Sequence, residues 1–332
     1  MMKAVRLHEI GGPQNLVLDD VPTPKPGPRE ILVRLSHAAL NHRDVFITQG
    51  KYPGIDLPRI LGSDGCGEVV ELGSEASGPA IGTRVVINPM LDWGSNPRVW
   101  SEKSSLLGMP RDGTFAQYIA VPDENVFAKP ASLSDEEAAA IPLAGVTAFR
   151  AAITRGQIAK GETVLITGIG GGVQTFVLLF AKQVGARVVV TSSSDEKLER
   201  ARALGADETI NYESDPDWQK SAKRLGIDIA VDSAGGETFA KVLDIMKYGG
   251  RVVTYGGTTG NASIRPFSIF WKHLDILGTS MGSPGDFAGM LGRFDGSIKP
   301  VVDRVYPMHE AVAAAARLDD AQQFGKIVLR LQ

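Results

Sequence analysis

A glycine-rich junction between an apolar strand and a helix limits the possible folds of this chain more than any other segment. The sequence VLITGIGGGVQTF, residues 164–176, is followed after about 20 residues by a second apolar strand, ARVVVT. Glycine lets a backbone approach a pyrophosphate, which binds to the free amides at a helix N-terminus. The order strand, loop, helix, strand therefore predicts a dinucleotide-binding site. The expected phosphate-binding residues are Gly170, Gly171, Gly172 and Val173.

The end of the second strand indicates which dinucleotide binds. NAD sites place a carboxylate there for the ribose 2′-hydroxyl, whereas NADP sites use hydroxyls and a cation for the 2′-phosphate. The sequence TSSSDEKLER supplies Ser192 and Ser193 at the strand end and Lys197 one turn into the next helix. We therefore expect NADPH, with NADH as the less favoured alternative because a small rotation would offer Asp195 to a ribose. In a second alternative, Ser194 is a simple N-cap and Lys197 a surface charge.

The chain divides into two halves with different patterns of predicted strands and helices. Residues 1–125 contain short strand-like runs broken by proline and glycine, which favours a mostly antiparallel barrel or sandwich. After Pro130, strands alternate with helices, which predicts a parallel, doubly wound sheet covered on both faces. The first helix of this half begins with a capping signature, Ser134 and Glu137, and Pro142 is expected to break or kink it.

Composition and charge exclude several classes of protein. The formal charge of −3 and the pI near 6.0 argue against a nucleic-acid or anionic-membrane surface. The N-terminal sequence has no apolar core of signal-peptide length, and no long apolar run occurs elsewhere. The single cysteine, Cys66, excludes an internal disulfide and a cysteine-rich zinc module. We expect a cytoplasmic protein that acts on a small molecule.

Further motifs extend over most of the chain, among them ILGSDGCGEVVELG, DGTFAQYIAVP, AAAIPLAGVTAF, ALGADETINY and GKIVLRL. With the all-β first half and the glycine loop, they make the chain resemble the medium-chain dehydrogenase/reductase superfamily. The resemblance implies an α/β protein in which a GroES-like, mostly-β catalytic domain, residues 1–126 and 299–332, encloses an inserted Rossmann domain, residues 127–298. It also implies a cofactor in the cleft between the domains. A homodimer joined through the strand LDILGTSMG, or a tetramer of such dimers, is implied as well.

Zinc alcohol dehydrogenases of this superfamily carry Cys-x-Thr/Ser-x-x-His, then Gly-His-Glu, and a Cys or Asp before AGVT. The corresponding positions here are Asn41, Ser63 and Leu143. An amide, a hydroxyl and an alkyl group cannot replace the nitrogen and sulfur donors that zinc prefers. Residues 89–112 keep the length of the structural-zinc lobe without a cysteine. We therefore expect no zinc. A relocated metal remains an alternative, with ligands His42, Asp44, Asp64 and Cys66.

The zinc-free branch is similar to quinone oxidoreductases and enoyl or alkenal reductases, and LNHRDVF, residues 40–46, looks like the corresponding loop of that branch. Alcohol oxidation without zinc loses the Lewis acid that stabilises the alkoxide. Hydride transfer to an already polarised acceptor needs less stabilisation by a Lewis acid. We expect NADPH-dependent reduction of a quinone or an α,β-unsaturated carbonyl. One alternative is an alcohol dehydrogenase-like enzyme, zinc-type by similarity. Another is a catalytically idle NADPH-binding sensor or structural protein.

The resemblance also suggests roles for individual residues. Asn41 would bond the nicotinamide ribose or the substrate oxygen, or else cap its loop. Arg43 would stabilise a developing oxyanion or form a salt bridge to Asp44 or Asp64. The candidate catalytic residues are Asn41, His42, Arg43, Asp44 and Ser63.

The remaining candidates concern the cofactor and the emptied zinc lobe. Thr147 would contact the nicotinamide side, Tyr212 would stack on the adenosine or pack in the core, and Lys326 would close the cofactor cleft. Two further residues would line that cleft, Gly256 and Thr258. Trp93 and Trp100 would wall the substrate pocket or fill the lobe.

Overall fold

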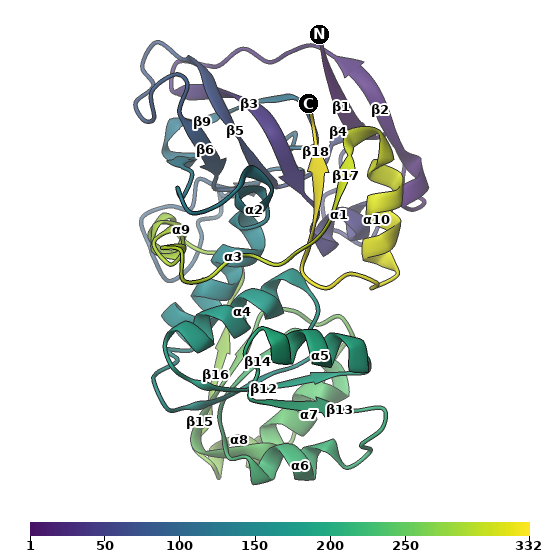
Figure 1. The fold of residues 1–332 in the computed structure, drawn as a ribbon, viewed down its shortest axis with the longest axis vertical. Coiled ribbons are helices and arrows are strands. Elements are labelled where there is room, and N and C mark those ends of the chain that lie inside the picture. The colour runs from purple at the N-terminus through teal and green to yellow at the C-terminus, as the bar shows by residue number, and fades with distance from the viewer. The chain divides into compact units, whose positions relative to one another are not determined.

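In the computed structural model, which describes residues 1–332, the chain folds into two compact units (Figure 1). The first unit consists of Met1–Ala144 and Ser283–Gln332, and the second is the continuous segment Gly145–Gly282. The expected boundaries, after residues 126 and 298, differ from these. Residues 127–144 and 283–298 belong to the first unit.

Contacts of two short helices explain this difference. Helix α2 (Asp135–Ala139) packs on the sheet of the first unit, where Ser36 Oγ donates to the Asp135 carboxylate at 3.2 Å. Helix α9 (Pro284–Leu291) brings the Phe287 ring to 4.9 Å from the ring of Phe127. Apolar and polar contacts of this kind hold both helices to the β-rich unit.

The first unit is built on strand β3 (Glu30–Ala39), the longest strand of its main sheet. The strand order is β10-β6-β5-β3-β18-β17, and β9 also pairs with β3. A smaller sheet has the order β2-β1-β4, and its apolar residues join the same core. The bounds are β1 (Met2–Leu7), β2 (Leu16–Val21), β4 (Arg59–Ile60), β5 (Asp64–Leu72), β6 (Arg84–Ile87), β9 (Tyr118–Pro122), β10 (Val126–Ala128), β17 (Val302–Pro307) and β18 (Lys326–Arg330).

Strand β18, from the end of the chain, lies beside β3 in this sheet (Figure 1). The two strands are antiparallel, with Val328 opposite Ala39. Because of this register, the start of β18 lies beside the end of β3, which Leu40 and Asn41 follow in the chain. Helix α10 (Ala311–Asp319) precedes β18 and packs on it.

Residues 40–46 were expected to form a loop, but most of them belong to helix α1 (His42–Thr48). The Asp44 carboxylate accepts the backbone N–H of Asn41 at 2.8 Å, as in a capping box. The helix starts directly after β3, so it leads away from the end of the main sheet.

The second unit contains the expected parallel sheet, with strand order β13-β12-β11-β14-β15-β16. Apolar residues of α6 and α7 pack on one face, and Figure 1 shows α5 on the opposite face. The strands are β11 (Thr163–Ile166), β12 (Arg187–Ser192), β13 (Glu208–Asn211), β14 (Ile227–Asp232), β15 (Met246–Thr254) and β16 (Asp275–Gly278). The helices are α4 (Gly172–Gln183), α5 (Asp195–Ala203), α6 (Trp218–Arg224), α7 (Gly236–Ile245) and α8 (Pro266–Phe270).

Two local features refine the expected elements. Pro142 interrupts the Ala-rich helix as predicted, and α3 (Pro142–Phe149) continues as a π-helix, Arg150–Arg155. Strand β15 begins at Met246, directly after the last residue of α7, Ile245. None of the helices combines the length and apolarity that crossing a membrane requires.

Candidate functional site

A buried polar cluster lies where β3 ends and β5 and β18 begin. The ammonium group of Lys326, at the start of β18, donates to the backbone oxygen of Leu40 and to Asn41 Oδ1, both at 2.6 Å. Its third partner is Asp64 Oδ2 at 2.9 Å. All the hydrogens of this ammonium group are therefore used within the first unit. Lys326 and Asp64 are 3% and 0% exposed, which makes them a fully buried ion pair.

Asp64 is the centre of the cluster. Its Oδ2 also accepts Asn41 Nδ2 at 2.9 Å, and its Oδ1 accepts the backbone N–H of Leu143 at 2.7 Å. Both oxygens of the carboxylate are thus satisfied, as a buried charge requires. Asn41 uses its amide oxygen and one amide hydrogen here, which leaves its second Nδ2–H without a partner in the chain.

Arg43 forms a second group of contacts beside the first. Its Nη1 donates to Ser63 Oγ at 2.7 Å and to the Leu107 oxygen at 2.8 Å, while Nη2 donates to the Met109 oxygen at 3.1 Å. Ser63 Oγ donates to the same Leu107 oxygen at 2.9 Å. The guanidinium group therefore fixes the segment around residue 107 and lies 4.0 Å from Asp44, at the limit of a salt bridge. Its carbon atom also lies 4.9 Å from the centre of the Tyr52 ring.

Asp44 carries the most perturbed carboxyl group of this region. Burial raises its pKa to about 6, although the Arg43 charge and the Asn41 N–H act in the opposite direction. Its Oδ1 is buried and has no hydrogen-bond partner. One oxygen caps α1 and the other is unsatisfied, so the carboxyl group holds its proton more strongly than an exposed aspartate does.

The structure brings together four of the five candidate catalytic residues, and His42 is exposed on α1. Lys326, expected to close over the cofactor, instead uses its ammonium group in this cluster. Asp64 was not among the candidate catalytic residues, although it is the hub. Its position directly after Ser63 was the available signal, because the zinc relatives carry a carboxylate there.

The donors of this cluster do not fit a zinc ion. Asn41 Oδ1 and Asp64 Oδ2 already hold the Lys326 ammonium, and Ser63 holds Arg43. Nowhere in residues 1–332 do three or more His, Cys, Asp or Glu side chains form a group that could hold a metal. Cys66 is a buried core residue, and burial raises the pKa of its thiol to about 11, so it is a poor source of thiolate.

The glycine loop of the second unit is shaped for a phosphate group. Gly170 has a φ of 134°, and a Cβ there would lie 2.9 Å from Lys197 Cδ. Gly171 is the N-cap of α4, and no side chain caps this helix, so the amides of the first turn remain available to an anion. Gln174 points to the neighbouring strand, where its Nε2 donates to Ser233 Oγ at 2.7 Å.

The side chains at the end of β12 surround the same loop. Ser192 is buried, with its Oγ accepting the backbone N–H of Ser194 at 3.1 Å, and Ser193 is exposed. The Lys197 side chain lies against Gly170, as the contact above shows. Asp195 Oδ1 accepts Asn211 Nδ2 at 2.7 Å, so one oxygen of that carboxylate is already used.

The other predicted cofactor residues also belong to the second unit. Thr147 is buried in α3, and Tyr212 is 39% exposed after β13, so Tyr212 does not pack in the core. Gly256 and Thr258 are exposed after β15, where the Thr258 N–H donates to the Ser233 oxygen at 3.3 Å. Asp232 was not among the predicted residues, and its buried carboxylate accepts Thr167 Oγ1 at 2.7 Å and the N–H of Gly235 at 2.9 Å. Burial raises the pKa of this carboxyl group.

The two tryptophans of the segment 89–112 contact each other. Their ring centres are 6.2 Å apart in an edge-to-face arrangement. Trp93 is buried, and its Nε1 donates to the Asn96 oxygen at 2.9 Å, whereas Trp100 is 41% exposed. Trp93 therefore fills the lobe.

Comparisons with known proteins agree with this architecture. Residues 27–131 match the family model for the alcohol dehydrogenase GroES-like domain, and residues 172–296 match that for zinc-binding dehydrogenase. The chain is 40% identical to a zinc-type alcohol dehydrogenase-like protein of Leptosphaeria maculans, over 95% of this chain and 94% of that protein. It is 31% identical to an acryloyl-coenzyme A reductase of Metallosphaera sedula, over 99% of each. A solved NAD-dependent alcohol dehydrogenase is similar over the full length of both chains, with a TM-score of 0.94 and 39% identity.

The β-rich unit, the parallel sheet and these relatives define a pyridine-nucleotide oxidoreductase with a GroES-like domain and a Rossmann domain. The chain belongs to the medium-chain dehydrogenase/reductase superfamily.

Proposed function

We propose that this protein is a zinc-independent, NADPH-dependent reductase that transfers hydride to a quinone or an α,β-unsaturated carbonyl. The observation that carries the proposal is the Lys326–Asp64–Asn41 cluster. The Lys326 ammonium group lies 2.6 Å from Asn41 Oδ1 and 2.9 Å from Asp64 Oδ2. Asn41 stands at the position of a metal ligand in the zinc relatives, and Asp64 directly follows another such position, Ser63. The cation of this region is thus part of the chain.

Acceptor chemistry follows from what the cluster lacks. Zinc makes an alkoxide accessible in alcohol oxidation, and an ammonium group with all its hydrogens already donated does not replace that Lewis acid. A quinone or enone is already polarised and needs only hydrogen bonds to its developing negative charge. The nicotinamide cofactor supplies the hydride.

The chain's own contribution begins at Asn41. Its second Nδ2–H is the remaining donor of the cluster, and it is held in a fixed direction because Lys326 and Asp64 bind the rest of the amide. A fixed donor stabilises a developing oxyanion without having to reorganise. Arg43 and Ser63 act indirectly by fixing the segment around Leu107.

A panel of acceptors tests the proposed reaction. Protein dialysed against a chelator is mixed with NADPH and a series of quinones and enals, and loss of the nicotinamide absorbance is followed. We expect turnover with at least one acceptor and no gain on adding zinc. Tight NADPH binding without turnover on any acceptor would refute the reductase function. Oxidation of primary alcohols that depends on added zinc would instead favour the alcohol dehydrogenase-like alternative, which the names of two relatives support.

Cofactor preference rests on Lys197, beside the glycine loop. Replacing Lys197 with Gln should weaken NADPH binding by ~1.5–3 kcal/mol, the range for a hydrogen bond to a charged group, and barely affect NADH. Titration of cofactor fluorescence measures both affinities. Lys220→Gln, at an exposed lysine of α6, is the matched control and should change neither. Equal losses for NADH and NADPH in Lys197→Gln would contradict the assignment.

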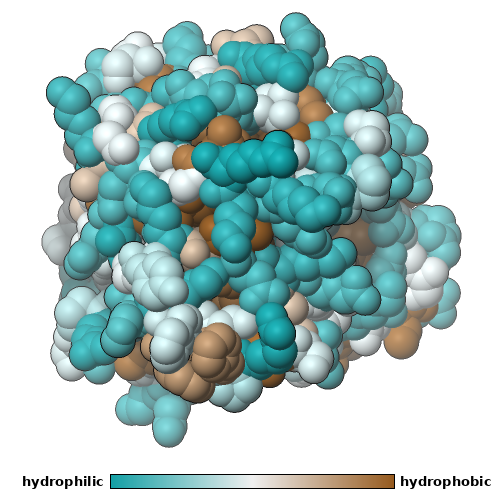
Figure 2. All heavy atoms as spheres, turned by 90° about the horizontal axis from the view of Figure 1, so that it is seen from below, coloured by the Kyte–Doolittle hydropathy of each residue, from teal (hydrophilic) through white to brown (hydrophobic).

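A homodimer through strand β16 extends the proposal. This strand is one of the two edge strands of the six-stranded sheet, and Ile276 on it is 38% exposed. Helix α8 nearby in sequence exposes Phe267 and Phe270, followed by Trp271. Figure 2 views the molecule from the side on which Figure 1 draws α6 and α8, and apolar side chains are visible there among hydrophilic ones. Sedimentation equilibrium tests the dimer, and a monomeric mass would contradict it.

A further inference from the structure

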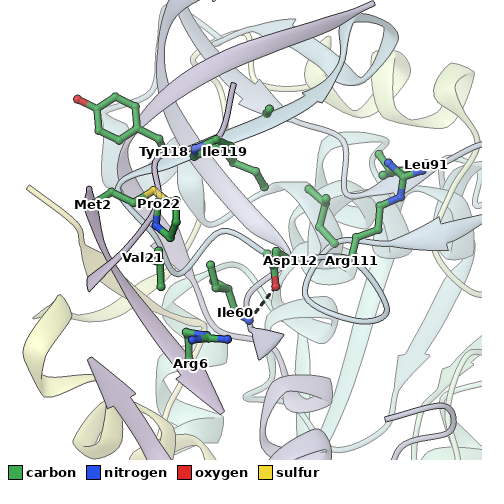
Figure 3. A pocket seen from close by; sticks show the side chains of 14 residues that line it. Met2, Arg6, Val21, Pro22, Ile60, Leu91, Arg111, Asp112, Tyr118 and Ile119 are labelled. Carbon is green, nitrogen blue, oxygen red and sulfur yellow. Dashed lines mark hydrogen bonds between the residues drawn. The ribbon is translucent and has the colours of Figure 1, made fainter. Parts of the chain in front are cut away.

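A cavity of about 340 Å³ in the first unit is balanced in charge (Figure 3). Each of its two arginines faces an aspartate. Arg6 Nη1 lies 3.5 Å from Asp19 Oδ2, and Arg111 Nη2 lies 3.9 Å from Asp92 Oδ2. The lining therefore favours neither an anion nor a cation. A more specific arrangement of polar groups lies beside the glycine loop of the second unit.

The side chain of Gln174, the third residue of α4, folds back over the glycine loop. A Cβ on Gly171 would collide with Gln174 Oε1 and would lie 3.3 Å from its Cδ. The amide therefore lies at the N-terminus of α4, where the free N–H groups of the first turn are available to a phosphate.

The end of β14 holds the other atom of this amide. Gln174 Nε2 donates to Ser233 Oγ at 2.7 Å, and Ser233 directly follows β14. The backbone oxygen of Ser233 accepts the Thr258 N–H at 3.3 Å, which fixes Ser233 at the end of the sheet. Because one end of the amide is anchored in this way, its other end stays over the loop.

Tyr255 gives Ser233 a second hydroxyl neighbour. Asp232 and Thr254 are opposite each other in the parallel pair of β14 and β15, so Ser233 and Tyr255 follow them side by side. Tyr255 Oη is buried and makes no hydrogen bond of ordinary geometry, and the Ser233 side chain is the hydroxyl that faces it. Burial raises the pKa of this phenol, while Ser233 acts in the opposite direction. The phenol stays protonated, so it can both donate and accept.

These contacts fit two orientations of the Gln174 amide. In the observed one, Nε2 donates to Ser233 and Oε1 lies over Gly171, so the Ser233 hydrogen is free for Tyr255 Oη. Half a turn about the Cγ–Cδ bond exchanges the two amide atoms. Ser233 then donates to Oε1, Tyr255 can donate to Ser233, and Nε2 lies over the loop. A hydroxyl both donates and accepts, so neither orientation leaves the serine without a partner.

A bound anion distinguishes the two orientations. An amide oxygen over the loop would repel the oxygens of a phosphate group, whereas an amide nitrogen would donate a charge-assisted hydrogen bond to them. We propose that Gln174 binds the diphosphate of the dinucleotide, and that its amide turns over on the Ser233–Tyr255 pair when the dinucleotide binds. This inference rests on the dinucleotide binding of the proposed function. It depends neither on the acceptor nor on the 2′-phosphate, because NADH and NADPH carry the same diphosphate.

Replacing Gln174 with Met tests the contact, because methionine has a similar length and no donor. In calorimetric titrations we expect ADP, NADH and NADPH each to bind roughly ten- to a hundredfold more weakly, by the same factor. Gln174→Glu places a negative charge over the loop and should weaken all three ligands further. Gln219→Met and Gln219→Glu make the same changes in α6 and should bind like the wild type.

NMR of the wild type tests the rotation without a substitution. In ¹⁵N-labelled protein, the side-chain NH₂ signals that are missing from Gln174→Met belong to Gln174. We expect ADP to shift these signals and to leave those of Gln219 in place. An unchanged unfolding temperature of ligand-free Gln174→Met would show that weaker binding comes from the lost amide.

Two results would overturn the inference. They are wild-type affinities for all three ligands in Gln174→Met, and Gln174 NH₂ signals that stay in place when the wild type is saturated with ADP. Failure of the wild type to bind ADP, NADH and NADPH would refute the cofactor assignment together with this inference. Tight binding without turnover on any acceptor would refute the reductase function alone.

Discussion

Replacing Lys326 with Met should lower the free energy of unfolding by ~3–5 kcal/mol, the loss typical when one partner of a buried ion pair is removed. The reason is that Asp64 stays fully buried while its only counter-charge, and the donor to Leu40 and Asn41, disappears. Urea unfolding followed by circular dichroism at neutral pH gives the difference.

Two further variants separate this effect from a general loss of charge. Lys3→Met breaks the exposed pair with Asp20, whose partners are 48% and 60% exposed, and should cost at most ~1 kcal/mol. Lys326→Met combined with Asp64→Asn removes the isolated charge and should recover a large part of the lost stability. A small loss in Lys326→Met, equal to that of Lys3→Met, would show that Asp64 tolerates burial without its partner.

Compared with the wild type, the Asp44→Asn variant should become more stable as the pH rises. The folded chain holds the Asp44 proton up to a pKa of about 6, whereas an unfolded chain releases it near pH ~4. Between these values the folded state binds more protons, so the contribution of Asp44 to stability falls with rising pH and is constant above that window. At pH 8 the stability that the wild type has lost through Asp44, relative to low pH, corresponds to roughly 2–3 kcal/mol. The asparagine oxygen can still accept the Asn41 N–H, so the α1 cap is kept.

Unfolding free energies of wild type and Asp44→Asn, measured at several pH values between 4 and 8, give this difference directly. We expect the gap between the two proteins to widen in favour of the variant as the pH rises, mostly between pH 4 and 6. Asp20→Asn, at an exposed carboxylate, is the control and should show no comparable trend. A constant gap for Asp44→Asn would mean that Asp44 ionises like an exposed aspartate.

Local patterns in the sequence were enough to predict much of the fold. The strands and helices of the second unit, the glycine loop and the break at Pro142 all depend on short-range periodicity or on one residue type, and the structure confirms them. The two compact units have other limits than the expected domains, because α2 and α9 are held by side-chain contacts to distant residues, such as that between Phe127 and Phe287. Helix α1 was missed because its seven residues, with their apolar side chains next to one another at 45–47, are too few to show a helical period.

The candidate site was likewise predicted only where local sequence is sufficient. The identities of Asn41 and Ser63 were enough to predict that the usual zinc donors are missing, because each position can be compared with the ligand motif by itself. The ion pair that joins Lys326 to Asp64 spans 262 residues, and no local pattern indicates it. The register of β18 on β3 creates this contact. The pairing of strands, which the sequence analysis did not predict, therefore decides where the positive charge lies.

The same strand has a consequence for how the chain is made. The second unit is one continuous segment, so a ribosome completes it before residues 283–332 emerge. The first unit has to wait for β18, since only that strand brings a counter-ion to Asp64. During synthesis the nucleotide-binding unit can therefore form early, while Asp64 stays without its counter-ion until β18 has been made. A chain cut just before Lys326 would keep its glycine loop and lose the charge balance of the polar cluster.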